Sequence, residues 1–192
     1  MEYIGLNSLH YHLKVLNHAN YKKNIKILEG EAKRIYKQII QALDYLHQNK
    51  IAHRDIKLDN ILLDKNNNVK LIDFGFSVIT KPYEKLNQYC GSLNYMSSEI
   101  LEKKQYLGFA VDVWASGVLL YVILCGTFPF KGENENEVLK SIQQGLHDFP
   151  YDLSQGVKNL FQQIFNQNQQ NRITTSQVLL LIIIQFYNNL FL

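Results

Sequence analysis

Cysteine is scarce in this chain of 192 residues, which contains only Cys90 and Cys125. These two residues have neither the spacing of metal ligands nor the even framework of a small disulfide-rich domain. We therefore expect two reduced thiols in an intracellular, cytoplasmic protein. The N-terminal sequence MEYIGLNSLHYH has no basic start followed by an apolar core, so we expect no signal peptide.

An excess of one charge is also small. The chain has 20 Lys and Arg residues against 17 Asp and Glu residues, which gives a formal net charge of +3. This excess is too small and too scattered for a nucleic-acid-binding stripe, so we expect no nucleic-acid partner. With 46% hydrophobic and 19% charged residues, the composition is that of an ordinary globular protein, and the length suits one domain.

Long uninterrupted hydrophobic runs are missing from the C-terminal end. Residues 178–184 (VLLLIII) are apolar, but Gln185, Asn188 and Asn189 interrupt the sequence that follows. A membrane-spanning helix needs roughly 20 apolar residues. A buried terminal helix is therefore favoured over a membrane anchor, and residues 185–192 are predicted to form a short apolar tail.

Hydrophobic periodicity predicts a mostly helical domain. Residues 31–48 have apolar positions every three or four residues, as an amphipathic helix does. Residues 111–125 are apolar all round, which is typical of a central buried helix. Residues 60–64 and 69–74 are short, rich in branched apolar residues and separated by a polar turn, so they predict a β-hairpin. The fold class expected is α+β.

A dense polar run, HRDIKLDN, occupies residues 53–60 between apolar segments. Buried charge is costly unless it is paired or bound to a metal, so the run is either a solvated loop or a site for a charged ligand. The hairpin brings Asp55 and Asn60, before its first strand, close to Asp73, at the end of its second. Asn60 and Asp73 then offer oxygen ligands that suit Mg²⁺. Asp55 is left free to accept a proton from a hydroxyl, and Lys57 is placed to neutralise a phosphate.

The octet at residues 53–60, followed by Asp73-Phe74-Gly75, resembles the catalytic core of eukaryotic protein kinases. The resemblance covers residues 1–184 and implies a protein-kinase-like fold in which this chain supplies the hinge and the helical C-terminal lobe. It implies serine/threonine specificity, from Lys57 and Ser92, and transfer of the ATP γ-phosphate to protein hydroxyls. The segments CGSLNY and LLYVILCGTFPF look most like the calmodulin-dependent and AMP-activated group.

The resemblance also assigns roles to single residues. Asp55 becomes the catalytic base and Lys57 the group that neutralises the transferred phosphate, while Asn60 and Asp73 hold Mg²⁺. Backbone groups of Glu2 and Ile4 are expected to bind adenine, with Leu62 beneath the ring.

Four scaffold roles follow from the same resemblance. Asp112 is expected to brace the catalytic-loop backbone, and Arg172 to pair with Glu99. His53 is expected to pack under Phe74, and Arg54 to hold the activation segment.

Some parts of the kinase pattern are missing from the 192 residues. The chain starts at the hinge, and the Gly-rich loop, strand lysine and helix glutamate of an N-terminal lobe are absent from it. We therefore expect residues 1–192 alone to turn over ATP barely. Gln88 stands where the resemblance leads us to expect a phosphorylated threonine.

Two functions remain open at this point. The first is a serine/threonine kinase whose partners are ATP, Mg²⁺ and a protein substrate. The alternative is a non-catalytic binding or scaffold module that pairs with another kinase or partner lobe. A free lobe would expose the apolar floor of the nucleotide cleft at Leu62 and Phe74.

Overall fold

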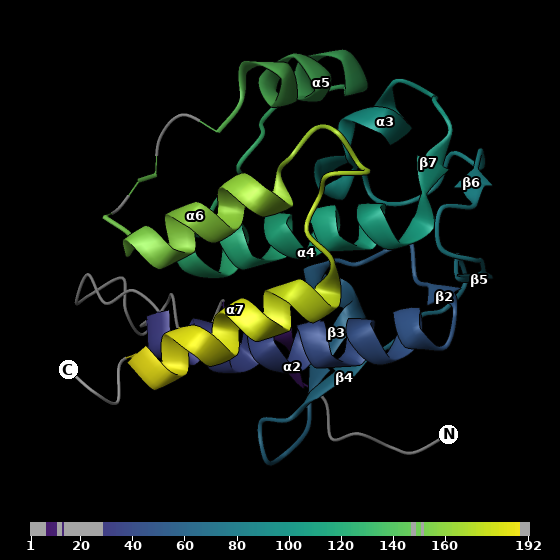
Figure 1. Ribbon diagram of the computed structural model, residues 1–192. Helices are drawn as coiled ribbons and strands as arrows, with labels where there is room; N and C mark the ends of the chain where they lie inside the picture. The colour runs from purple at the N-terminus through teal and green to yellow at the C-terminus, as the bar shows by residue number, and fades with distance from the viewer. Residues whose placement is uncertain (1–6, 11–12, 14–28, 147–148, 151, 189–192) are drawn as a thin grey trace.

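The computed structural model describes residues 7–10, 13, 29–146, 149–150 and 152–188 (Figure 1). Its longer helices are α2 (Glu29–Gln48), α4 (Gly108–Cys125), α5 (Glu135–Gln144), α6 (Gln155–Ile164) and α7 (Thr175–Asn188). The shorter ones are η1 (Leu58–Asn60), η2 (Leu93–Tyr95) and α3 (Ser98–Leu101). The strands are β1 (Asn7–Ser8), β2 (Ile51–Ala52), β3 (Ile61–Leu63), β4 (Val69–Leu71), β5 (Val78–Ile79), β6 (Lys85–Leu86) and β7 (Tyr106–Leu107). The mostly helical architecture with short strands is the one that the sequence predicts.

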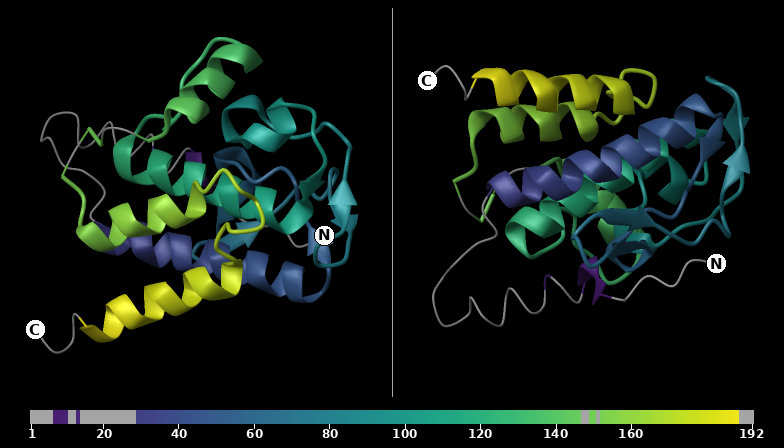
Figure 2. Two further views of the ribbon diagram at one scale, coloured as in Figure 1. Left: turned by 45° about the horizontal axis from the view of Figure 1, so that its top comes forward. Right: turned by 90° about the horizontal axis from the view of Figure 1, so that it is seen from below.

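Helix α2 lies between two other helices. Its predicted apolar positions Ile35, Ile39, Leu43 and Leu46 are all buried. The helix packs against α4 and α7, and α4 packs in turn against α6 (Figure 2). The predicted helix at residues 31–48 is confirmed, because the spacing of its apolar residues gives one face to the core.

Helix α4 is the centre of the molecule, as its uniformly apolar sequence predicts. Its Trp114, Val118 and Leu119 are completely buried. By length and composition it is the one helix of the described residues that could cross a membrane, but 83% of it is buried inside the protein. It ends at Gly126, whose φ of 70° is a left-handed conformation that glycine adopts without steric cost.

The predicted hairpin is present and slightly shorter than expected. Strand β3 pairs with β4 in antiparallel register, with Ile61 opposite Leu71 and Leu63 opposite Val69, and β1 pairs with the other edge of β3. In the turn, one Asp64 oxygen accepts hydrogen bonds from the backbone N–H of Asn66 and Asn68, both at 2.8 Å. Such a turn is what the polar run between the strands predicts.

Helix α7 begins with a reciprocal cap. The Thr174 hydroxyl accepts a hydrogen bond from the Gln177 N–H at 3.3 Å, and Gln177 Oε1 accepts one from the Thr174 N–H at 2.9 Å. The terminal helix was expected to be buried, but only one face of it is, with Val178 and Ile182 inside and Leu180 exposed. The helix continues past residue 185 to Asn188.

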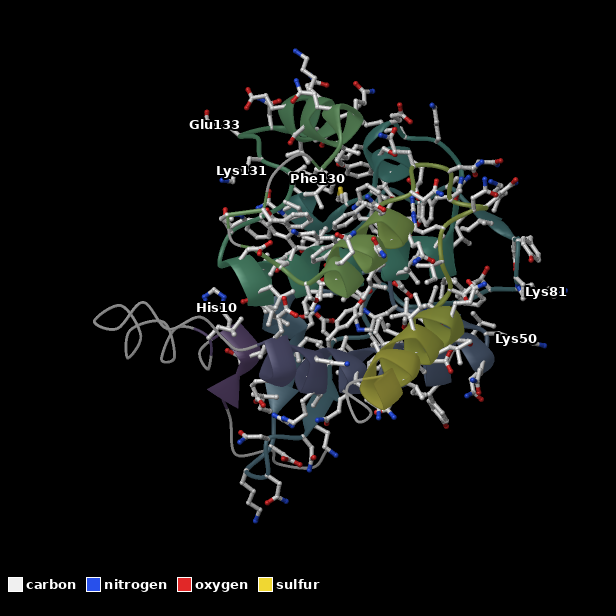
Figure 3. All side chains as sticks on the ribbon, turned by 60° about the vertical axis from the view of Figure 1, so that its left-hand side comes forward. His10, Lys50, Lys81, Phe130, Lys131 and Glu133 are labelled. Atoms are coloured by element: carbon white, nitrogen blue, oxygen red, sulfur yellow. The ribbon has the colours of Figure 1, made fainter. Side chains whose placement is uncertain are left out.

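Two small ladders complete the fold beside the helices. Strand β2 pairs with β5, and β6 pairs with β7, so the segment between the hairpin and α3 is anchored twice. Lys50 and Lys81, which flank the β2–β5 pair in the chain, point outward in Figure 3. Phe130, by contrast, is buried and stacks on Trp114 with ring centroids 5.5 Å apart.

Candidate active site

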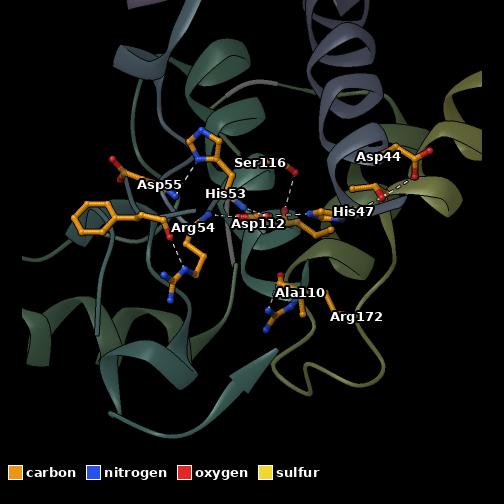
Figure 4. A network of polar contacts seen from close by, with 12 residues as sticks. Asp44, His47, His53, Arg54, Asp55, Ala110, Asp112, Ser116 and Arg172 are labelled. Atoms are coloured by element: carbon orange, nitrogen blue, oxygen red, sulfur yellow. Dashed lines mark hydrogen bonds and ion pairs between the residues drawn. The ribbon is translucent and has the colours of Figure 1, made fainter. Parts of the chain in front are cut away.

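The loop that carries the polar run is fixed from below by Asp112 of α4 (Figure 4). Asp112 Oδ2 accepts a hydrogen bond from the His53 N–H at 2.8 Å, and Oδ1 accepts one from the Arg54 N–H at 2.7 Å. His47 Nε2 of α2 lies 2.9 Å from Oδ2. The Asp112 side chain is fully buried, so these contacts are the partners that a buried carboxylate requires. The expected bracing role is confirmed.

The backbone at Arg54 is strained. Its φ of 66° is left-handed, a conformation that costs a non-glycine residue about 1–3 kcal/mol. The two hydrogen bonds from Asp112 hold the loop in this conformation. The neighbouring His53 ring lies 5.1 Å from the Phe74 ring and its Nε2 is 3.1 Å from the Ile72 carbonyl oxygen, as its predicted packing role requires.

Asp55 lies at the end of this strained loop and is buried. Its Oδ2 accepts hydrogen bonds from the Lys57 ammonium at 2.6 Å and from the Asn60 amide at 3.1 Å. Its Oδ1 accepts one from the Ser92 hydroxyl at 3.0 Å. The carboxylate expected to be free is therefore fully engaged, and Lys57 lies on the side that the sequence predicts.

The Lys57 ammonium joins this group of residues together. It is 2.6 Å from Asp55 Oδ2 and donates a second hydrogen bond to Ser92 Oγ at 3.1 Å. Ser92 comes from the segment before η2, 35 positions further along the chain. One cation thus connects the catalytic loop with the segment that the resemblance places beside the acceptor substrate.

Asn60 is oriented by its own loop. Its Nδ2 donates to the Asp55 carbonyl oxygen at 2.8 Å and to Asp55 Oδ2. Both amide hydrogens point at Asp55, so the Oδ1 atom is directed elsewhere. Among the described residues no hydrogen bond to that oxygen is recorded, which fits a ligand position.

Asp73 lies one residue after Ile72, whose N–H donates to the Asn60 carbonyl oxygen at 3.0 Å. The β3–β4 pairing thus brings the backbones at residues 60 and 72 together, as the hairpin argument predicts. Asp73 has a φ of 62° and accepts the Gly75 N–H on Oδ1 at 3.2 Å. A Cβ atom at Gly75 would lie 3.1 Å from that oxygen, so the small residue is needed there. Asp73 is exposed.

The oxygen set of Asn60 and Asp73 fits Mg²⁺ by its chemistry, since this ion takes few protein ligands and completes its shell with phosphate oxygens and water. Within the residues that the structure describes, no group of three or more His, Cys, Asp and Glu side chains could hold a metal ion. The sequence-predicted pair is smaller than such a group and remains a prediction.

The residues predicted to bind adenine are only partly described. Leu62, in β3, is half-buried and lies opposite Ser8 of β1. Glu2 and Ile4 lie outside the described residues, so their predicted backbone contacts stay predictions.

Arg54 reaches the activation segment, as the resemblance predicts. Its Nε donates to the Phe76 carbonyl oxygen at 2.7 Å, and its Nη2 donates to Gln88 Oε1 at 3.0 Å. Sequence reasoning missed its third partner, the hydroxyl of Tyr106, at 3.1 Å from Nη1. Nothing in the local sequence of β7 marks that tyrosine, because only the tertiary fold brings it to the loop.

A second missed residue is Tyr95 of η2. Its hydroxyl accepts a long hydrogen bond from the Leu58 N–H at 3.4 Å. Burial raises the pKa of Tyr95 to about 12, and the nearby carboxylates of Asp59 and Asp55 act in the same direction. The residue therefore stays a neutral phenol in the physiological pH range and adds no charge beside Asp55.

A buried ion pair closes the base of the site. Arg172 Nη1 lies 2.7 Å from Glu99 Oε1, and Nη2 lies 3.2 Å from Glu99 Oε2, a two-point contact that the sequence predicts. The guanidinium also donates to the Ala110 carbonyl oxygen and lies 4.9 Å from the Trp114 ring centroid. The pair connects the end of the activation segment with α4 and the loop before α7.

Comparison with known proteins agrees with this geometry. The family model described as the protein kinase domain matches residues 1–181. The carbon catabolite-derepressing protein kinase of Candida tropicalis is 45% identical over 154 residues, which is 80% of this chain and 25% of that protein. Its counterpart in Secale cereale is 41% identical over 153 residues, again 80% of this chain and 30% of that protein.

The serine/threonine protein kinase OSK3 of Oryza sativa subsp. indica is also 41% identical over 153 residues, 80% of this chain and 30% of that protein. The chain thus spans about a quarter to a third of the length of these curated relatives. Most of the family model's match, residues 29–181, is the part described above, with its braced loop and buried ion pair. The chain belongs to the protein kinase family, whose members in these comparisons are named serine/threonine kinases.

Proposed function

We propose that this chain forms the catalytic C-terminal lobe of a serine/threonine protein kinase, which transfers the γ-phosphate of ATP to hydroxyl groups of a cytoplasmic protein substrate. One observation carries the proposal. The buried Asp55 carboxylate holds the Lys57 ammonium at 2.6 Å while it accepts a hydroxyl, that of Ser92, at 3.0 Å. A base, a cation and a site for a hydroxyl thus lie at one point.

Each residue has a distinct part in this chemistry. Asp55 orients the acceptor hydroxyl and takes its proton as the bond to phosphorus forms. Lys57 offsets the negative charge of the phosphoryl group, and its hydrogen bond to Ser92 keeps the acceptor segment beside it. Ser92 in place of a bulkier residue leaves room for a serine or threonine acceptor.

Kinases of this family generally use ATP with Mg²⁺. Asn60 and Asp73 are the residues that would hold the ion here, and its chemistry is to neutralise charge on the phosphate oxygens. The chain's own contribution is to fix both ligands. Asn60 is oriented by its two hydrogen bonds to Asp55, and Asp73 by its bond to the Gly75 N–H.

The test is transfer of radiolabel from the γ-phosphate of ATP to peptides with serine, threonine or tyrosine as the sole acceptor. The whole product of the gene is assayed, because the chain spans only 25–30% of its relatives. Asp55→Asn is expected to lower transfer to serine and threonine at least about 100-fold. Asp64→Asn, in the exposed hairpin turn, is the matched control and is expected to leave transfer unchanged. Equal activity in Asp55→Asn, or transfer to tyrosine alone, contradicts the proposal.

The binding-module alternative has one supporting observation. Phe74, on the floor of the expected nucleotide cleft, is 46% exposed, and Leu62 is half-buried. An aromatic side chain at the surface can pack against a partner lobe. Under this alternative, Asp55→Asn leaves capture of the partner lobe intact, whereas Phe74→Ala weakens it.

A further inference from the structure

One side chain holds both ends of the segment between residues 76 and 88. The Arg54 guanidinium is buried and donates to the Phe76 carbonyl oxygen at 2.7 Å and to the Gln88 side-chain oxygen at 3.0 Å. The two acceptors are separated by 12 positions of chain. Arg54 therefore closes this stretch into a loop whose two ends meet at the residue next to Asp55.

The charge of this contact is unusual. A buried guanidinium is normally compensated by a carboxylate or another anion, because an unpaired buried charge is costly. In the part of the chain that the structure describes, all three side-chain hydrogen bonds of Arg54 go to neutral oxygens, and no ion pair of this residue is recorded. Gln88 supplies the only side-chain amide among these partners.

Gln88 is held a second time through its backbone. The Tyr106 hydroxyl donates to the Gln88 carbonyl oxygen at 2.7 Å while it accepts from Arg54 Nη1. Burial raises the pKa of Tyr106 to about 12, so the hydroxyl keeps the proton that it donates. Tyr106 itself is fixed, because it is buried in the β6–β7 ladder opposite Leu86.

We propose that Gln88 is a positioning residue, which latches residues 76–88 onto the catalytic loop through Arg54 without any phosphorylation. The inference deepens the proposed kinase function, since the loop that the latch steadies carries Asp55. Glutamine has no hydroxyl, so this position cannot be phosphorylated. Its neutral oxygen does permanently what a charged group at the same place would do only after modification.

The path from the latch to the base is short. The Arg54 side chain binds Gln88 and Phe76, while the Arg54 backbone N–H binds Asp112 and the next residue is Asp55. The backbone of Arg54 is already in a left-handed conformation. A change in the pull on its side chain is therefore transmitted to the position of the Asp55 carboxylate.

The experiment is hydrogen–deuterium exchange on the 192-residue chain, read by peptide for residues 77–90, with α2 and α4 as internal references. Gln88→Leu keeps the approximate size and removes the oxygen, and we expect exchange in residues 77–90 to become about tenfold faster. Gln88→Glu restores an oxygen and adds a charge, so we expect exchange at the wild-type rate or slower. Exchange in α2 and α4 is expected to stay the same in both variants.

Two results would overturn the latch. One is a Gln88→Leu protein that exchanges residues 77–90 at the wild-type rate. The other is a wild-type protein whose exchange in this segment rises as much after treatment with a protein phosphatase as it does in Gln88→Leu. Because the readout is exchange and not phosphate transfer, a chain with an intact latch but no kinase activity rejects the proposed function alone.

Discussion

Two aspartates in this molecule make nearly the same hydrogen bonds in opposite surroundings. Asp112 accepts the N–H groups of His53 and Arg54 at 2.8 and 2.7 Å, and Asp64 accepts those of Asn66 and Asn68 at 2.8 Å each. Asp112 is fully buried beneath the catalytic loop. Asp64, in contrast, belongs to the exposed turn of the hairpin. Each carboxylate shapes one turn of chain.

The difference lies in what water can replace. When the bond to an exposed N–H is lost, water takes the vacant place at little cost, whereas a buried N–H is left without a partner. The catalytic loop therefore depends on its buried acid far more than the hairpin turn depends on its exposed one. The same contrast separates the Glu99–Arg172 pair in the interior from the Glu31–Arg34 pair at the surface.

The buried ion pair gives the largest expected effect. Glu99→Gln leaves the Arg172 guanidinium buried without its counter-charge, and we expect the free energy of unfolding to fall by about 3–5 kcal/mol. Urea denaturation of the 192-residue chain, followed by circular dichroism, measures this change.

Glu31→Gln is the matched control for this measurement. It removes one partner of a pair whose side chains are 38% and 39% exposed, and we expect a loss of at most about 1 kcal/mol. Equal losses in the two variants would show that burial does not set the strength of these pairs.

The catalytic-loop acid gives the next effect. Asp112→Asn keeps the size but turns one acceptor into a donor that faces a backbone N–H, and we expect a loss of about 1–3 kcal/mol. Thermal unfolding measures it. An unchanged melting temperature would contradict the bracing role of Asp112.

The exposed turn gives the smallest effect, and it depends on pH. The backbone N–H of Asn68, the largest cause, and other hydrogen bonds hold the pKa of Asp64 below its usual value of 3.8. A lowered pKa stabilises the folded chain above the unfolded-state value and loses that contribution as the pH falls through the folded-state value. Wild type should therefore melt slightly above Asp64→Asn at neutral pH, and the gap should close in acid. A gap that widens in acid contradicts this account.

Much of the architecture follows from local sequence. Apolar spacing predicts α2, and the uniformly apolar stretch predicts that α4 is central, because both patterns allow only one way to bury their surface. The polar run between two apolar strands predicts the hairpin, and the hairpin places residue 60 beside residue 72. The Asp112 brace and the Glu99–Arg172 pair were expected from the resemblance and are present.

What the sequence did not predict depends on tertiary contacts between distant segments. Tyr106 and Gln88 meet Arg54 from positions 52 and 34 residues away, and no local pattern marks either residue. Asp55 was expected to be free, but Lys57, Asn60 and Ser92 all bind it. The last of these comes from a segment whose approach depends on the whole activation segment.

The most direct test of the account compares kcat for peptide phosphorylation in Asp112→Asn and Asp64→Asn. The whole gene product is used, at a temperature where circular dichroism shows both variants folded. If the buried acid positions Asp55 for phosphoryl transfer, kcat falls about 100-fold in Asp112→Asn, since a displacement near 1 Å has that cost, and is unchanged in Asp64→Asn. A folded Asp112→Asn protein with wild-type kcat would contradict the claim that this framework sets the geometry of the active site.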